Sequence, residues 1–250
     1  MLDGARTAAI CVAAVALAVV AFAPDPDAPS VTTLDRMERA FVPRTEAAAP
    51  TPELRSLPDA WSAHEREHHA AAVYSATFSL DRVPDEPWVV YVPRADMDAA
   101  VRVNGALLGG PTELRTAPRR MRHYPLRFDV PEGLLRAGDN DVEVGRRVEP
   151  TSSGALSAVH IGPQAVLGPA HAWTRLVQID LVRIFALLAI ALVTDVLVLF
   201  RRRDPTTSYR WLVVALSCWT VYSLEVWVRA PPMSARGVEV VAARANFLGV

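Results

Sequence analysis

Short segments with β character fill the middle of the chain, from Leu57 to Leu167. Residues 74–80 alternate apolar and polar side chains with a period of two, as expected of a strand with one buried face. Further segments of β character lie at residues 88–92, 101–103, 126–130, 142–144 and 157–161. Asn104-Gly105 is a strong hairpin signal because both residues of such a turn must tolerate positive φ. We therefore predict a mainly β domain over residues 57–167, folded as an antiparallel sandwich.

A strongly apolar pattern follows the predicted sandwich. Residues 173–200 are long and apolar enough to cross the hydrocarbon core of a bilayer, 211–228 form a second such segment, and 238–250 begin a third. The loop 201–210 between the first two carries four arginines and one acid, so the positive-inside rule makes it cytoplasmic. We predict an α-helical transmembrane bundle with the sandwich outside. Because the third segment stops in mid-pattern, we expect the chain to be a truncated part of a longer protein.

The start of the chain also indicates export. Residues 1–23 resemble a secretory signal peptide, and Ala21-Phe22-Ala23 offers small residues at a cleavage site. Pro24 would follow the scissile bond directly, so an uncleaved N-terminal anchor is the alternative. Residues 24–56 are rich in Pro and Ala and predict a linker, with one short helix possible at Leu34–Phe41. In a bacterium, these features predict a multi-pass protein of the inner membrane with the sandwich in the periplasm.

Charge and composition narrow the possible functions. The 250-residue chain has a formal net charge of −1, but residues 24–173 hold 16 arginines and 21 acidic residues, a net charge of −5. Such a domain is not expected to bind nucleic acid, which requires a basic surface. Cys11 and Cys218 lie outside the sandwich, which therefore forms no internal disulfide. No nucleotide or dinucleotide motif is present, and we expect no cofactor.

One segment matches a metal-binding motif. Residues 64–68 read H-E-x-x-H, in which two histidines one helical turn apart bind zinc and the glutamate activates water. This motif raises the alternative of a membrane-tethered zinc hydrolase with His64 and His68 as ligands. Pro58 lies just before the only stretch that could be helical, and a strand is predicted from Val73. That leaves no room for a catalytic helix, so we expect a solvated, histidine-rich turn.

Four arginines are concentrated just before Tyr124. They are Arg115, Arg119, Arg120 and Arg122. Arginine offers bidentate hydrogen bonds to carboxylates and phosphates, and a flat face on which rings stack. In a chain without lysine, a solvated loop explains the same cluster. If the domain has a ligand pocket, we predict that Arg119, Arg122 and Tyr124 bind the ligand and that Trp88 stacks on it.

The order of motifs in the sandwich resembles a known family. Residues 57–61 read L-P-D-A-W, residues 100–105 read A-V-R-V-N-G with Leu108-Gly109 after them, and residues 138–140 read G-D-N. This order is similar to the exported galactose-binding-like, jelly-roll domain of bacterial membrane sensors. Such domains resemble the sugar-binding module of family 2 glycoside hydrolases, in which a similar V-N-G…L-G hairpin occurs. The arrangement with the apolar segments resembles seven-transmembrane receptors with diverse intracellular signalling modules.

The resemblance implies a sensory function. The chain is then the input half of a receptor, with a sensor histidine kinase as the expected parent and a homodimer as its expected state. The sandwich would bind a small molecule, a carbohydrate or an exported partner protein. These residues contain no phosphoacceptor histidine segment and no ATP-binding glycine motif, so they hold no catalytic domain. A membrane-tethered accessory carbohydrate-binding module is the alternative, beside the zinc hydrolase.

Overall fold

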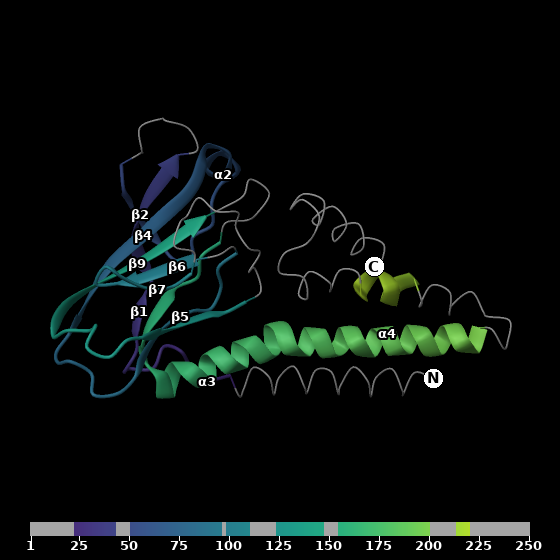
Figure 1. The fold of residues 1–250 in the computed structure, drawn as a ribbon. Coiled ribbons are helices and arrows are strands. Elements are labelled where there is room, and N and C mark those ends of the chain that lie inside the picture. The colour runs from purple at the N-terminus through teal and green to yellow at the C-terminus, as the bar shows by residue number, and fades with distance from the viewer. Residues whose placement is uncertain are drawn as a thin grey trace.

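Two antiparallel sheets packed face to face form the body of the protein, and a long helix extends from one of them (Figure 1). The computed structural model describes residues 23–43, 51–96, 99–110, 124–147, 155–200 and 214–220. The six-stranded sheet has the order β3 (Glu53–Ser56), β2 (Arg36–Pro43), β4 (His69–Leu80), β9 (Gly138–Arg147), β6 (Ala99–Val103), β7 (Ala106–Gly109). The four-stranded sheet has the order β1 (Thr32–Leu34), β10 (Val159–Pro163), β5 (Trp88–Val92), β8 (Leu126–Val130).

The core lies between the sheets and uses the alternation seen in the sequence. On β4, Tyr74 and Phe78 are buried in the core, whereas Thr77 and Ser79 between and after them are exposed. The facing sheet contributes Val90 and further apolar side chains of β5, β8 and β10. The predicted strands at 74–80, 88–92, 101–103, 126–130 and 142–144 are confirmed, as is the β-sandwich.

The predicted hairpin is confirmed, and its asparagine also binds a neighbouring loop. Asn104 and Gly105 join β6 to β7 with φ of 48° and 79°, the left-handed values that this turn requires. The Asn104 side chain donates to the Leu134 carbonyl and to Asn140 Oδ1, both at 2.8 Å. Asn140 is fully buried and also donates to the Arg136 and Gly138 carbonyls. The two asparagines therefore fix the loop between β8 and β9.

The structure corrects the expectation of a linker over residues 24–56. Strands β1, β2 and β3 lie there, and β2 pairs with β4 inside the six-stranded sheet. The short helix considered for Leu34–Phe41 was wrong, since that stretch is strand β2 except at its first residues. The inward positions of β2 include Met37, Arg39 and Phe41. An arginine at an inward position hides the alternation by which the other strands were predicted.

Arg39 is buried because three carboxylates surround its guanidinium group. It is 1% exposed and forms ion pairs with Glu53 of β3, with Asp59 at 2.9 Å, and with Glu65 of α2 (Ala63–His68). Its guanidinium carbon also lies 4.2 Å from the ring centroid of Phe41. A buried charge is tolerated only when it is paired in this way. The arginine thereby joins β2, β3, α2 and the segment before α2.

A continuous helix begins where β10 ends, with no linker between them. It consists of α3 (Gln164–Arg175), the π-helical segment η1 (Leu176–Asp180) and α4 (Leu181–Phe200). Helix α3 lies on the outer face of the four-stranded sheet, where Leu167 and Ala170 pack against Val89 and Tyr91. The Tyr91 hydroxyl donates to Thr174 Oγ1 at 2.8 Å. The base of the helix is therefore part of the sandwich.

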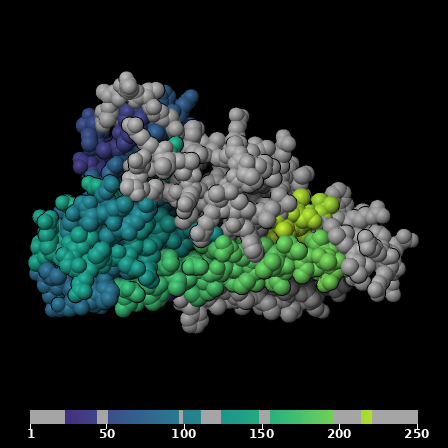
Figure 2. Space-filling model, in the orientation of Figure 1, coloured from purple at the N-terminus to yellow at the C-terminus, as the bar shows by residue number. Residues whose placement is uncertain are grey.

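Beyond α3 the helix extends away from the sandwich (Figure 2). Of the described residues, Gln164–Asp195 form the one helix that is long and apolar enough to cross a membrane by length and composition. It contains most of the predicted segment 173–200. Of the predicted segment 211–228, residues 214–220 are described and are helical. The expected signal at 1–23 except Ala23, the loop 201–210 and the segment 238–250 lie outside the described residues.

We expect Arg39→Leu to lower the free energy of unfolding by about 3–5 kcal/mol, because it leaves three carboxylates without their shared cation. Arg55→Leu is the matched control, since Arg55 is 42% exposed and bonds to the same Glu53. Arg55→Leu should lower the free energy of unfolding by no more than about 1 kcal/mol. Urea denaturation of the detergent-solubilised chain, followed by circular dichroism, measures both. Equal losses in the two variants would contradict the role given to Arg39.

Candidate functional site

The H-E-x-x-H segment, residues 64–68, forms all of helix α2 except its first residue. Ser62 caps this helix: its backbone N–H donates to Glu65 Oε2 at 2.6 Å, and Ser62 Oγ accepts from the Glu65 N–H at 3.2 Å. This reciprocal pair is a capping box. The other carboxylate oxygen of Glu65 accepts from Arg39. Both oxygens of Glu65 therefore have partners, and the carboxylate is not placed to activate a water molecule.

The two motif histidines lie together on the surface, and no third ligand accompanies them in the part of the chain that the structure describes. The His64 and His68 rings are 4.1 Å apart, and His68 Nδ1 lies 2.9 Å from the His64 carbonyl oxygen. His69, next along the chain, stacks instead on Phe41. Among the described residues, no three His, Cys, Asp or Glu side chains are grouped as a metal ion would require. The geometry fits a capped surface helix rather than the zinc hydrolase considered above.

A chain of buried polar groups lies below α2. The Tyr74 hydroxyl donates to Asp59 Oδ2 at 2.7 Å and accepts from Trp61 Nε1 at 2.8 Å. Burial raises the pKa of Tyr74 to about 12. The hydrogen bond from Arg39 lowers the pKa of Glu53. Burial alone would raise the pKa of Glu65, but hydrogen bonds from Ser62 and Arg39 outweigh the effect of burial and lower this pKa. These groups bond to one another, which indicates a structural role.

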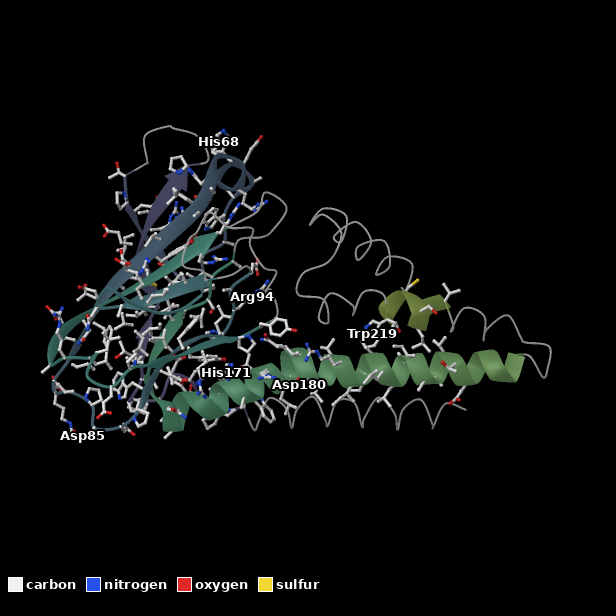
Figure 3. All side chains as sticks on the ribbon, in the orientation of Figure 1. His68, Asp85, Arg94, His171, Asp180 and Trp219 are labelled. Carbon is white, nitrogen blue, oxygen red and sulfur yellow. The ribbon has the colours of Figure 1, made fainter. Side chains whose placement is uncertain are left out.

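A pocket of about 550 Å³ opens at the other end of the sandwich. Figure 3 labels Asp85 there, at the opposite end of the sandwich from His68. The pocket lies between the β4–β5 loop and the β8–β9 loop. Its lining residues are Val83, Pro84, Asp85, Glu86, Pro87, Trp88, Val130, Pro131, Glu132, Gly133 and Leu135. Its volume falls in the range of about 300–1,000 Å³ that is usual for small-ligand sites.

The pocket combines an apolar floor with an acidic rim. Trp88 and Leu135 pack against the sandwich core, so the pocket is the open end of that core. Asp85, Glu86 and Glu132 are exposed at its rim, and no Arg or His occurs among the described lining residues. An aromatic side chain with carboxylate acceptors around it suits a neutral polyol or a cation. The same rim repels anions.

One wall of the pocket is attached to the base of the helix. Trp88 pairs with Pro163 in the β5–β10 ladder, and Pro163 is the residue that precedes α3. The backbone N–H of Gln164, the first residue of α3, donates to the Pro87 carbonyl at 2.8 Å. The pocket wall at Pro87 and Trp88 is therefore bonded directly to the first turn of the helix.

The structure separates two of the predicted ligand-binding residues. Trp88 lines the pocket, but Tyr124 does not. Tyr124 packs against Ile179, and its hydroxyl accepts from Arg183 Nη2 at 2.7 Å. Arg119 and Arg122 lie outside the described residues.

The sequence reasoning missed the acidic rim of the pocket. Asp85 and Glu86 stand between Pro84 and Pro87, and Glu132 follows another proline. Such turns are commonly solvated, so their composition alone does not distinguish a binding loop. The available signal for a binding loop was that Pro84 and Pro87 lie just before Trp88, which was predicted to stack on a ligand.

Tyr74 should make the stability of the protein sensitive to alkali. Its pKa is raised in the folded state, so above a pH of about 10 the unfolded chain loses the proton first and stability falls. Tyr74→Phe has no phenol hydroxyl and therefore no proton to lose at this position. We expect the difference in unfolding free energy between wild type and Tyr74→Phe to fall by about 1.4 kcal/mol per pH unit above that point. Urea denaturation at pH 8, 10 and 11 tests this, and a constant difference would contradict it.

Comparison with known proteins adds a distant likeness to glycosidases. No protein-family model and no curated protein sequence matches the chain. Among solved structures, a GH2 β-galacturonidase from Eisenbergiella tayi is 14% identical with a TM-score of 0.40, over 53% of this chain and 24% of that one. A β-glucuronidase from Ruminococcus gnavus is 14% identical (TM-score 0.40, 52% and 29%). One from Bifidobacterium dentium is 20% identical (TM-score 0.36, 50% and 21%). The chain thus spans less than a third of the length of each enzyme.

Proposed function

We propose that the chain is the sensory part of a multi-pass membrane receptor, with a periplasmic, galactose-binding-like sandwich that binds a neutral carbohydrate at the Trp88 pocket. The observation that carries this proposal is the attachment of the pocket wall to the helix, through the Gln164 N–H and the Pro87 carbonyl. Binding is thereby linked to the one described element that is long enough to cross a membrane.

The chemistry of the pocket supports a neutral sugar. The C–H face of a pyranose ring packs on an aromatic side chain such as Trp88, and its hydroxyl groups donate to carboxylates. Asp85, Glu86 and Glu132 supply these acceptors at the rim. The same three carboxylates disfavour a uronic acid, whose own charge they would repel.

The dimensions of α4 support a membrane location. Its 20 residues extend about 30 Å, the thickness of the hydrocarbon core. Ile184, Phe185 and Leu188 are about half exposed, as expected of side chains that face lipid. The charged residues Asp180 and Arg183 lie just before them, 3.9 Å apart, at the level where polar headgroups would begin.

A receptor needs its ligand to favour one of two arrangements of sandwich and helix. The pairing of Trp88 with Pro163 and the hydrogen bond from Gln164 to Pro87 provide such a dependence. An accessory carbohydrate-binding module would need only the pocket. This observation favours the sensor over the accessory module. A histidine kinase output and a homodimeric state belong to the proposal through the family resemblance.

Replacement of Trp88 should weaken sugar binding according to what the new side chain can stack. Trp88→Leu fills the core without an aromatic face and should raise the Kd at least about tenfold. Trp88→Phe keeps a smaller ring and should lie between Trp88→Leu and wild type. Titration calorimetry of the full chain in lipid nanodiscs, with the methyl glycosides of galactose, glucose and mannose, measures these effects. Glu67→Gln, an exposed change on α2 at the opposite end of the sandwich, is the control and should leave the Kd unchanged.

Two results of that titration would contradict the proposal. The first is the absence of binding by all three glycosides at millimolar concentration. The second is binding of choline and of none of the sugars, which would assign the acidic pocket to cationic ligands through a cation–π contact with Trp88. Glucuronate is expected to bind more weakly than glucose.

Cysteine labelling tests the topology. Ser79 is exposed on β4, and Thr206 lies in the arginine-rich loop 201–210. With Cys11 and Cys218 replaced by serine, Ser79→Cys should react with a membrane-impermeant maleimide in spheroplasts, and Thr206→Cys only after permeabilisation. The reverse pattern would contradict a periplasmic sandwich.

A further inference from the structure

We infer that the carbohydrate is an oligosaccharide whose second sugar unit binds on helix α3, in a hollow beside the Trp88 pocket. This inference rests on the proposed function. The hollow has a volume of about 510 Å³ and is lined by Glu86, Pro87, Gln164, Ala165, Gly168 and Pro169. Glu86 and Pro87 also line the Trp88 pocket, so the two depressions lie on either side of one short segment.

The helix offers an unusual acceptor in this hollow. Pro169 lies inside α3 and has no backbone N–H, so the carbonyl of Ala165, four residues earlier, receives no helical hydrogen bond from that position. Ala165 is exposed. A hydroxyl group of a bound sugar can donate to this carbonyl. The side-chain amide of Gln164 and the carboxylate of Glu86 provide further partners on the same wall.

Gly168 leaves space in the hollow. A Cβ atom at this position would lie 3.9 Å from Gln164 Cγ and 4.0 Å from Arg127 Nη1, which are ordinary contact distances. The glycine is therefore not required by close packing, although glycine destabilises a helix interior relative to alanine. Its missing side chain keeps the floor of the hollow open.

A ligand that occupies both depressions contacts two parts of the protein at once. In the Trp88 pocket it contacts the sandwich loops at 83–86 and 131–133. In the hollow it contacts the first turns of α3. Such a ligand binds best when loops and helix have one particular relative position, which a ligand confined to the Trp88 pocket specifies less strictly. The length of the oligosaccharide would then determine how strongly binding acts on the helix.

Titration calorimetry with sugars of increasing length tests this inference. The probes are β-linked galactose, glucose and mannose oligosaccharides of one, two and four units, added to the full chain in nanodiscs. For at least one series we expect the disaccharide to bind about tenfold more tightly than the single sugar. Gly168→Trp fills the hollow and should remove this gain while leaving single-sugar binding unchanged. Gly168→Ala, which fits at ordinary contact distances, should keep it.

The outcomes separate this inference from the proposed function. If single sugars bind in a Trp88-dependent way but longer ones bind no more tightly, the second subsite is wrong and the proposed function stands. The same holds if Gly168→Trp leaves the gain intact. If no sugar of any length binds the wild-type chain, both fail. A gain that Gly168→Trp removes and Gly168→Ala retains supports the subsite, and circular dichroism establishes that both variants are folded.

Discussion

Strand β5 is buried on both of its faces, and the placement of the pocket and the helix follows from that constraint. An antiparallel sheet often leaves one face to solvent. Here Val90 and Val92 face the sandwich core, while Val89 and Tyr91 face α3. Since β10 is the hydrogen-bonded neighbour of β5, a helix that begins at the end of β10 reaches this second face at once. The pocket forms where β5 starts, at Trp88, so one short strand links the core, the pocket and the helix.

Strands could be predicted from the sequence wherever the inward residues are apolar. The segment 88–92 was identified as a β run without alternation, and its burial on both faces explains why alternation is absent. Prediction failed at β2 because Arg39 occupies an inward position. Its carboxylate partners come from β3, from α2 and from the turn before α2, and no local pattern reveals that they meet. In a sequence, a buried ion pair looks the same as two solvated charges.

The candidate site could be predicted only in part, because local sequence patterns do not reveal contacts between distant segments. Trp88 was identified from its own strand, but the support of the pocket loop depends on Asn104 in the β6–β7 turn and on Asn140 near the start of β9. The Asn104-Gly105 turn was recognised from the local sequence, whereas the hydrogen bond between the two asparagines is a product of the fold. The H-E-x-x-H segment differs, because the contact that explains its glutamate is made by residues close together in the sequence. In the structure Ser62 and Glu65 form a capping box, and this local contact accounts for the glutamate without a metal.

The π-helical segment η1 sets the rotation of α4 about its own axis. Thr174, which bonds to Tyr91, and Ile179, which packs on Tyr124, are five positions apart yet both face the sandwich. In a regular α-helix such positions point about 140° apart, and the wider π turn brings them to the same side. Removing one residue from η1 would turn every side chain of α4 by about 100° relative to the sandwich. A single extra residue thus determines which face of the apolar helix lies on the same side as the sandwich contacts.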